Sequence, residues 1–138
     1  MKNSEVNYIA KLRNSGLRPT KQRIKICEVL FNREKTFHFS INDLIKILQD
    51  QHNLKISLAT VYNTVHAFQK KGYLKEIPVK SSESYYDTNV SHHHHFFDEN
   101  DGRLIDINET DVGPIDIQTK IPGKKIKSIE VFVKLEDQ

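Results

Sequence analysis

The sequence predicts an α+β protein in which a helical, basic first half precedes a strand-rich, acidic second half. Apolar residues recur about one helical turn apart up to Gly72, and short alternating segments separated by turn residues follow. Residues 1–80 carry 15 of the 21 Lys and Arg but 6 of the 18 Asp and Glu, whereas residues 81–138 carry 6 and 12. We expect the basic half to bind a polyanion and the acidic half to bind cations; two solvated surfaces of opposite charge are the alternative.

Four helices are expected in the first half, each marked by a capping or stop residue and an apolar face. Gly16 ends the first, Thr20 caps the second after Pro19, Ser40 caps the third in a capping box with Asp43, and Ser57 and Gly72 bound the fourth. The expected inward residues are Val6, Ile9 and Leu12; Ile24, Ile26, Cys27, Leu30 and Phe31; Leu44, Ile47 and Leu48; and Leu58, Val61, Val65 and Phe68.

The segments that follow the fourth helix read as a basic hairpin. Residues 73–80 and 83–89 are extended in character, and Ser81 and Ser82 join them. Helices followed by such a hairpin are the layout of a winged helix-turn-helix, so residues 1–85 are expected to be a DNA-binding domain. The fourth helix has a narrow apolar stripe and a small polar face, which suits the major groove.

The second half, residues 86–138, is expected to be a small α/β dimerisation domain. Residues 94–100 and 102–108 read as two strands joined by a tight Asn100-Asp101-Gly102 turn, and residues 126–135 read as a third strand. Pro114 and Pro122 bracket a segment whose structure the sequence leaves open. Three strands and one short helix bury too little apolar surface alone, so we expect a homodimer through residues of about 90–138.

The run His92–His95 lies inside the chain, before a strand-like acidic stretch. Side chains alternate between the faces of a strand, so His93 and His95 are expected on one face and His92 and His94 on the other. Two imidazoles two residues apart can bind one metal ion, with the nearby carboxylates, and Zn, Mn and Fe accept such ligands. A solvated loop of idle histidines is the alternative.

Several classes of protein are disfavoured by composition. No apolar run approaches the length of about 20 residues that spans a bilayer, and the N-terminus lacks the apolar core of a secretory signal. The single cysteine, Cys27, suits a reducing cytoplasm and is expected in the core. No HExxH motif, Ser/His/Asp order or Gly-rich phosphate loop is present, so we expect no enzyme.

Four segments in order, LRPTKQRIKI, FHFSINDLIKIL, LATVYNTVHAF and YYDTNVSHHHHFFDENDGRLIDI, resemble the ferric uptake regulator family over about residues 10–108. ATVYNT, YYDTN and the short C-terminus are most similar to its iron response regulator branch. The resemblance implies a winged helix, a dimerisation domain and a metal site holding Zn, Mn or Fe. The implied ligands are His38, Asp87, His93, His95 and Asp106.

The chain departs from the family pattern at three places. Asp98 and Asp101 stand where many members have a Cys-x-x-Cys pair, which excludes a thiolate zinc site. A further family site uses acidic and His ligands from the C-terminal region; no histidine follows His95, so His92 and His94 are expected to have few partners. Some members of the branch bind haem through Cys-Pro, but Glu28 follows Cys27, so haem would need the residues His92, His93, His94 and His95.

The resemblance also implies a dimeric transcriptional repressor of iron homeostasis that binds A·T-rich, two-fold symmetric operators. Residues expected at DNA are Arg18 in a minor groove, Ser57, Thr60, Tyr62 and Asn63 at the recognition helix, and Lys75 and Lys80 on the wing. Tyr62 is alternatively a core-edge aromatic, and the two lysines are alternatively solvated. A metalloenzyme and a metal-buffering protein without DNA function are the competing functions.

Overall fold

The computed structural model describes residues 2–80 and 83–138, with side chains from Ser4 onward except that of Lys80. The chain divides into two compact units, residues 1–90 and 91–138. The expected boundary lay at residue 85. Asn89 donates its backbone N–H to Asp87 Oδ1 at 2.8 Å, so the end of the wing is fastened to the first unit. Asp87 thereby belongs to the first unit, whereas the expected boundary placed it in the second.

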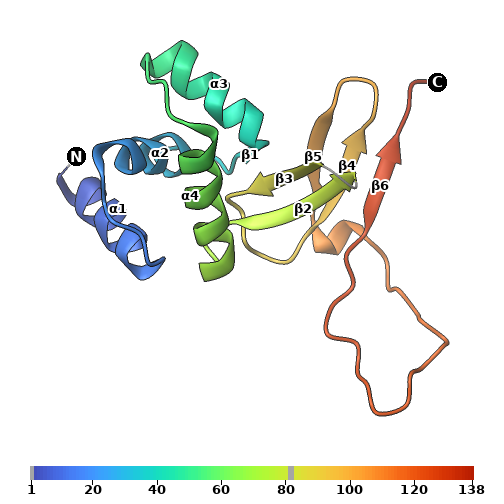
Figure 1. Cartoon of the computed structure of the whole chain (residues 1–138). Helices are drawn as coiled ribbons and strands as arrows, with labels where there is room; N and C mark the ends of the chain where they lie inside the picture. Colours follow the sequence, from blue (N-terminus) through green and yellow to red (C-terminus); the bar gives the residue numbers. More distant parts are fainter. Residues whose placement is uncertain (1, 81–82) are drawn as a thin grey trace. The chain divides into compact units, whose positions relative to one another are not determined.

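The first unit is a winged helix (Figure 1). Its elements are α1 (Lys2–Asn14), α2 (Lys21–Phe31), β1 (His38–Phe39), α3 (Ile41–His52), α4 (Leu58–Lys71), β2 (Lys75–Lys80) and β3 (Glu83–Asp87). The three strands form one antiparallel sheet in the order β1-β3-β2. The predicted four helices and the pairing of the two wing strands, and with them the α+β fold class, are confirmed, while the predicted turn at Ser81 and Ser82 lies outside the described residues.

The helix ends follow the local signals in the sequence. The side chain of Thr20 accepts from Arg23 N–H, and Ser40 and Asp43 form a reciprocal capping box. Ser57 caps α4, and Gly72 ends it in the left-handed conformation at φ 94°, which glycine adopts without a steric penalty. These helices therefore begin and end where short-range hydrogen bonds satisfy their terminal groups.

One apolar core fills the first unit. Phe68 of α4 is fully buried, and its ring lies edge-on to Phe31 at 5.6 Å between centroids. Two expected inward residues are instead exposed: Val6 by 63% and Leu58 by 61%. Tyr8 and Thr64 are buried in the same helices. The core residues are Tyr8, Leu12, Ile26, Cys27, Val29, Leu30, Phe39, Leu44, Leu48, Ile56, Val61, Val65, Phe68, Leu74 and Tyr86.

The burial of Thr64 has a local cause that periodicity does not reveal. Its hydroxyl donates to the carbonyl of Thr60 at 2.7 Å, one turn earlier in α4. The polar atom is thus satisfied within the helix, and the methyl group can enter the core. This turns the buried face of α4 away from Leu58.

The second unit is a three-stranded sheet in the order β5-β4-β6. β4 (His94–Asp98) pairs antiparallel with β5 (Arg103–Ile107) and parallel with β6 (Phe132–Leu135), and a short 3-10 helix, η1, covers Glu109–Asp111. The turn between β4 and β5 is longer than expected because it includes Glu99, and it closes with Gly102 N–H on the Asp98 carbonyl at 2.8 Å. The third strand, β6, is shorter than the expected 126–135, since β4 pairs with it only from His95 to Asp98.

Little of the second unit is shielded from solvent. Its buried hydrophobic residues are Phe97, Leu104 and Ile107, and residues 113–128 are exposed without exception. Such a core is small for an independent domain, as expected from the sequence. No helix within residues 2–80 and 83–138 is long and apolar enough to cross a membrane.

Candidate functional site

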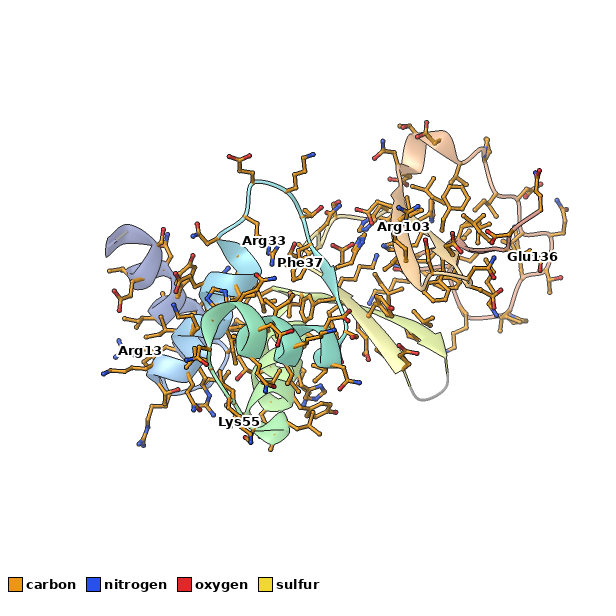
Figure 2. All side chains as sticks on the ribbon, turned by 90° about the horizontal axis from the view of Figure 1, so that it is seen from above. Arg13, Arg33, Phe37, Lys55, Arg103 and Glu136 are labelled. Atoms are coloured by element: carbon orange, nitrogen blue, oxygen red, sulfur yellow. The ribbon has the colours of Figure 1, made fainter. Side chains whose placement is uncertain are left out.

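The start of β1 is fastened to the end of the wing. Phe37 donates its N–H to Thr88 Oγ1 at 2.8 Å, and Thr88 returns its own N–H to the Phe37 carbonyl at 3.1 Å. The Arg33 guanidinium lies 3.6 Å from the centre of the Phe37 ring, and the two side chains lie together in Figure 2. These contacts fix the backbone next to His38 and Asp87, which adjoin Phe37 and Thr88 in the sequence.

His38 and Asp87 form a buried imidazole–carboxylate pair in the first unit. They are register partners on β1 and β3, and His38 Nε2 lies 3.0 Å from Asp87 Oδ2. Asp87 is fully buried, while the side chain of His38 is 21% exposed. A carboxylate removed from water needs a charged or hydrogen-bonding partner, and this pair offers one nitrogen and one oxygen ligand to a cation.

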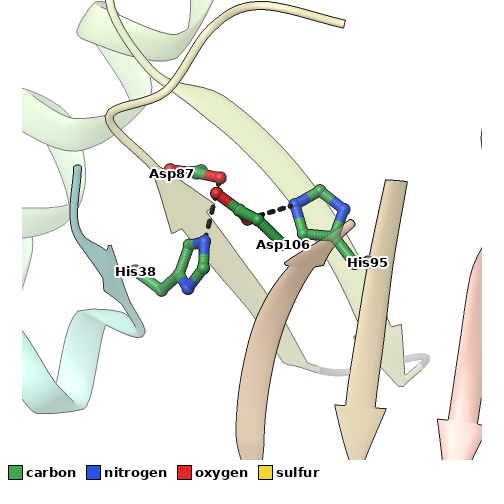
Figure 3. A group of neighbouring side chains, drawn as sticks. All are labelled: His38, Asp87, His95 and Asp106. Carbon is green, nitrogen blue, oxygen red and sulfur yellow. Dashed lines mark hydrogen bonds and ion pairs between the residues drawn. The ribbon is translucent and has the colours of Figure 1, made fainter. Parts of the chain in front are cut away.

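The second unit gathers His93, His95 and Asp106. Both imidazoles approach the same carboxylate oxygen, with His93 Nε2 3.2 Å and His95 Nε2 3.3 Å from Asp106 Oδ1. His95 and Asp106 are register partners on β4 and β5, and the rings of His93 and His95 lie 4.4 Å apart. Figure 3 draws the His95–Asp106 pair and, from the first unit, the His38–Asp87 pair. The expected alternation thus holds, although His93 precedes the first residue of the strand.

The contact of the second ring nitrogen of His93 fixes the orientation of this ring. Nδ1 lies 2.7 Å from the Ser91 carbonyl, which only accepts, so Nδ1 carries a proton and donates it. In the neutral ring Nε2 then presents a lone pair toward the Asp106 carboxylate, a repulsive arrangement. A proton on Nε2 or a cation beside it removes that repulsion. A hydrogen bond from the other ring nitrogen to a backbone carbonyl is also how proteins orient metal-binding histidines.

His92 and His94 face away from this group, and the expectation that they have few partners is wrong. His94 is buried, and its Nδ1 accepts the N–H of Val131 at 2.9 Å. His92 lies 3.5 Å from a Glu109 carboxylate oxygen and places Nε2 3.0 Å from the Ile129 carbonyl. A cavity of about 500 Å³ is lined by these two histidines, Glu109 and the bases of the long exposed loop. Glu109 carried no signal in the sequence, because its neighbours are ordinary polar loop residues.

Cys27 belongs to the core, as expected. Its side chain is fully buried, and burial raises the pKa of the thiol from 9.0 to about 12. A thiol kept protonated at neutral pH is neither a ready metal ligand nor a reactive nucleophile.

The exposed surface of α4 carries several of the residues expected at DNA. Tyr62 is 48% exposed, and its ring stacks on His66 at 5.6 Å between centroids. Asn63 is exposed beside it, whereas the Ser57 hydroxyl is engaged with Thr60 at 2.9 Å. Arg18 is exposed and Lys75 is half-buried, but the side chain of Lys80 lies outside the described part of the chain.

Comparison with known proteins decides the family. The model of the ferric uptake regulator family matches residues 14–135. The chain belongs to the ferric uptake regulator family. The resemblance predicted from the sequence is thereby confirmed, while the assignment to the iron response regulator branch stays a prediction.

Individual family members agree over most of the chain. The Peroxide operon regulator of Bacillus subtilis is 35% identical over 95 residues, which are 69% of this chain and 63% of that protein. The Ferric uptake regulation protein of Cupriavidus metallidurans is 33% identical over 104 residues, 75% of this chain and 71% of that protein. The match thus spans less than two thirds of the first of these relatives.

Two solved structures show the same fold. The ferric uptake regulator of Pseudomonas aeruginosa, solved with manganese, has a TM-score of 0.67 at 20% identity and covers 95% of this chain and 98% of its own. That of Vibrio cholerae has a TM-score of 0.68 at 22% identity and covers 94% and 98%.

Proposed function

We propose that this member of the ferric uptake regulator family is a cytoplasmic, homodimeric transcriptional repressor whose DNA binding depends on a divalent metal ion. One observation carries the metal dependence: His93 and His95 converge on one oxygen of Asp106, while the far nitrogen of His93 is fixed on a backbone carbonyl. Structural neighbours solved with manganese, with iron and with zinc support Mn, Fe or Zn as the ion.

We propose that His38, Asp87, His93, His95 and Asp106 bind one such ion together. The pair in the first unit supplies two donors and the group in the second supplies three, and these ions usually take four to six. Neither group alone supplies that many donors, whereas the five donors together fall within this range. An ion shared by both units couples their orientation, and hence the spacing of two recognition helices in a dimer. Its loss lowers affinity for a two-fold symmetric operator.

The first unit supplies the proposed DNA contacts. Asn63 and Tyr62 on the exposed face of α4 are proposed to read base edges, since bidentate Asn–adenine contacts are a common form of major-groove recognition. Arg18 is proposed to enter an A·T-rich minor groove, and Lys75 and Lys80 to contact phosphates. Ser57 and Thr60 fix the first turn of α4 and bring its N-terminal amides to the phosphate backbone.

Iron homeostasis is the process we propose to be regulated. A peroxide response is a second candidate, because relatives from Bacillus subtilis and Staphylococcus aureus carry peroxide regulators' names. Derepression in cells by iron chelation or by hydrogen peroxide separates the two. Haem binding by His92–His95 stays a prediction.

The test measures metal and DNA on the same preparations. Untagged wild type and the variants His93→Ala, His95→Ala and His92→Ala are analysed for bound Mn, Fe and Zn and then titrated with genomic fragments at fixed salt. We expect the first two variants to lose metal and operator affinity together. His92→Ala is the matched control, because the His92 ring lies beside Glu109 and His94 rather than beside Asp106.

Four results contradict the proposal. Equal metal loss in all three variants describes a flexible chelating loop. Full operator affinity without metal removes the regulatory role. Metal binding without any DNA binding leaves a metal-buffering protein, and turnover of a substrate by the metal-loaded chain establishes an enzyme.

A further inference from the structure

The exposed side of α4 is a continuous stripe that extends beyond the residues proposed to read bases. Ala59, Tyr62, Asn63 and Lys70 are exposed, and His66 lies half-buried among them. This spacing, with steps of three or four residues, places all five on one side of the helix. His66 therefore shares the side of Tyr62 and Asn63, yet none of the proposed DNA contacts uses it.

The ring of His66 stacks on the ring of Tyr62. The two ring planes are inclined by only 10°, at 5.6 Å between centroids. Residues four apart in a helix make such contacts because side chains lean toward its N-terminus, which brings the later ring over the earlier one. Within residues 4–79 and 83–138 the Tyr62 hydroxyl has no hydrogen-bond partner. The stack, rather than a hydrogen bond, thus orients this side chain.

The Tyr62 ring has room to turn away from His66. A hollow of about 690 Å³ lies between α4 and the wing, and Tyr62, Glu76 and Tyr86 are among the residues that line it. Because the Tyr62 side chain is 48% exposed, packing in the core does not confine it. Long side chains in a helix choose mainly between two χ1 rotamers. The direction of the Tyr62 ring therefore depends on the stack, and removing the His66 ring frees it to turn toward the wing.

His66 also lines a second hollow, of about 360 Å³, between the ends of α1 and α4. Its polar lining residues, with no carboxylate among them, are Asn14, Ser15, Asn63, His66, Lys70 and Lys71. Such a lining suits a DNA phosphate, so His66 has two conceivable roles: a phosphate contact through a ring nitrogen, and orientation of Tyr62 through the ring face. The stack is present within the chain itself, whereas a phosphate contact depends on DNA. The geometry thus favours the second role.

We propose that His66 is a positioning residue that holds the Tyr62 ring in the direction that meets base edges. The inference rests on the proposed function and deepens it by naming what fixes one of the base-reading side chains. A protein binds more weakly in proportion to the fraction of time its contact residue points elsewhere. An aromatic stack biases such a choice by up to roughly tenfold. Its loss weakens binding about twofold if both directions are otherwise equal, and by about tenfold if the wing side is preferred.

The first experiment observes the stack by NMR in the full-length chain without DNA. His66→Phe keeps a flat ring at this position, whereas His66→Gln keeps hydrogen-bonding groups but no ring. His52→Gln, at the exposed end of α3, is the matched control that removes an imidazole elsewhere in the same unit. We expect the Tyr62 ring signals to move toward those of an unstructured tyrosine in His66→Gln alone. Unchanged Tyr62 signals in that variant overturn the inference, and circular dichroism checks that all variants fold.

The second experiment measures DNA binding by fluorescence anisotropy at fixed pH and salt. The probe is a duplex selected from random sequence by the Mn²⁺-loaded wild type, together with duplexes in which each base pair is substituted in turn. Tyr62→Ala identifies the base pairs that Tyr62 reads. We expect His66→Gln to lose roughly two- to tenfold in affinity, with discrimination reduced at those same pairs, and His66→Phe to match the wild type. In a Tyr62→Ala chain His66→Gln should have no further effect, because no ring remains to be held.

The outcomes separate this inference from the proposed function. If His66→Phe binds as weakly as His66→Gln, the ring nitrogens contact DNA directly and the inference is overturned. Independent, additive losses from Tyr62→Ala and His66→Gln overturn it as well. A Tyr62→Ala protein with wild-type discrimination shows that Tyr62 reads no base, and the inference fails together with that proposed contact. If the wild type selects no duplex, the proposed function itself is wrong, whatever the NMR spectra show of the stack.

Discussion

Replacing Asp106 with Asn tests whether this carboxylate is a metal ligand or only a structural hydrogen-bond acceptor. The substitution preserves shape but removes the negative charge that lies 3.2 Å from His93 Nε2 and 3.3 Å from His95 Nε2. Because His93 Nδ1 donates to the Ser91 carbonyl, Nε2 of the neutral ring has no proton to give a carboxylate, whereas an amide can donate one to Nε2. The metal-free variant is therefore expected to be as stable as the wild type or more stable.

The magnitudes follow from the contacts. One new neutral hydrogen bond contributes about 1 kcal/mol to the free energy of unfolding. A metal ion at about 100 times its dissociation constant adds about 2.7 kcal/mol to the wild type. Losing a charged ligand weakens binding by at least the roughly 10- to 100-fold typical of groups that only orient ligands. At about 100-fold, the stabilisation by the same metal concentration falls to about 0.4 kcal/mol.

The assay is urea unfolding followed by circular dichroism, with EDTA or with Mn²⁺ at the same concentration for both proteins. The expected pattern is opposite in sign: relative to the wild type, Asp106→Asn is about 1 kcal/mol more stable without metal and about 1.3 kcal/mol less stable with it. A variant that is less stable without metal yet keeps the full Mn²⁺ effect refutes the reasoning. Asp106 would then accept hydrogen bonds from protonated imidazoles rather than bind the ion.

Three further outcomes are expected. Burial raises the pKa of the Cys27 thiol to about 12, so the contribution of this residue to the free energy of unfolding is complete below about pH 9. Above that pH the contribution falls by about 1.4 kcal/mol per pH unit, because the thiol ionises in the unfolded chain but not in the folded one. Urea unfolding from pH 8 to 11 should therefore show a shallower alkaline decline in stability for Cys27→Ala. His94→Ala leaves the Val131 N–H without its acceptor and should cost about 1–3 kcal/mol of unfolding free energy with unchanged metal content, and an unchanged stability argues against that bond. Asn63→Ala should reduce discrimination between operator sequences by about 1–3 kcal/mol, whereas Lys75→Ala should weaken binding to all sequences alike and reduce the salt slope by about 1. Fluorescence anisotropy over a salt series distinguishes the two effects. An Asn63→Ala protein with unchanged sequence preference would show that other residues read the bases.

Helix ends and the two hairpins in this protein were predictable because their causes are local. Ser40 and Asp43 cap one another across three residues, and Gly72 ends α4 by its own backbone conformation. Which apolar residues enter the core was less predictable. Val6 and Leu58 fit the helical period yet are exposed, because the neighbouring helices bury Tyr8 and an internally bonded Thr64 instead.

The contacts of the run His92–His95 likewise divide into those that the sequence predicted and those that it did not. Alternation along an extended chain was enough to pair His93 with His95, since it depends only on backbone geometry over three residues. The order of helices and hairpin predicted the winged-helix class, and the family resemblance, also a property of the sequence, supplied the candidate ligands. Only the tertiary structure brought Glu109, Ile129 and Val131 to His92 and His94, from as many as 37 residues away. Only it left Ile115, Ile117, Ile121 and Ile126 exposed to solvent. Contacts between distant segments depend on the summed packing of the whole unit, and no short stretch of sequence contains that information.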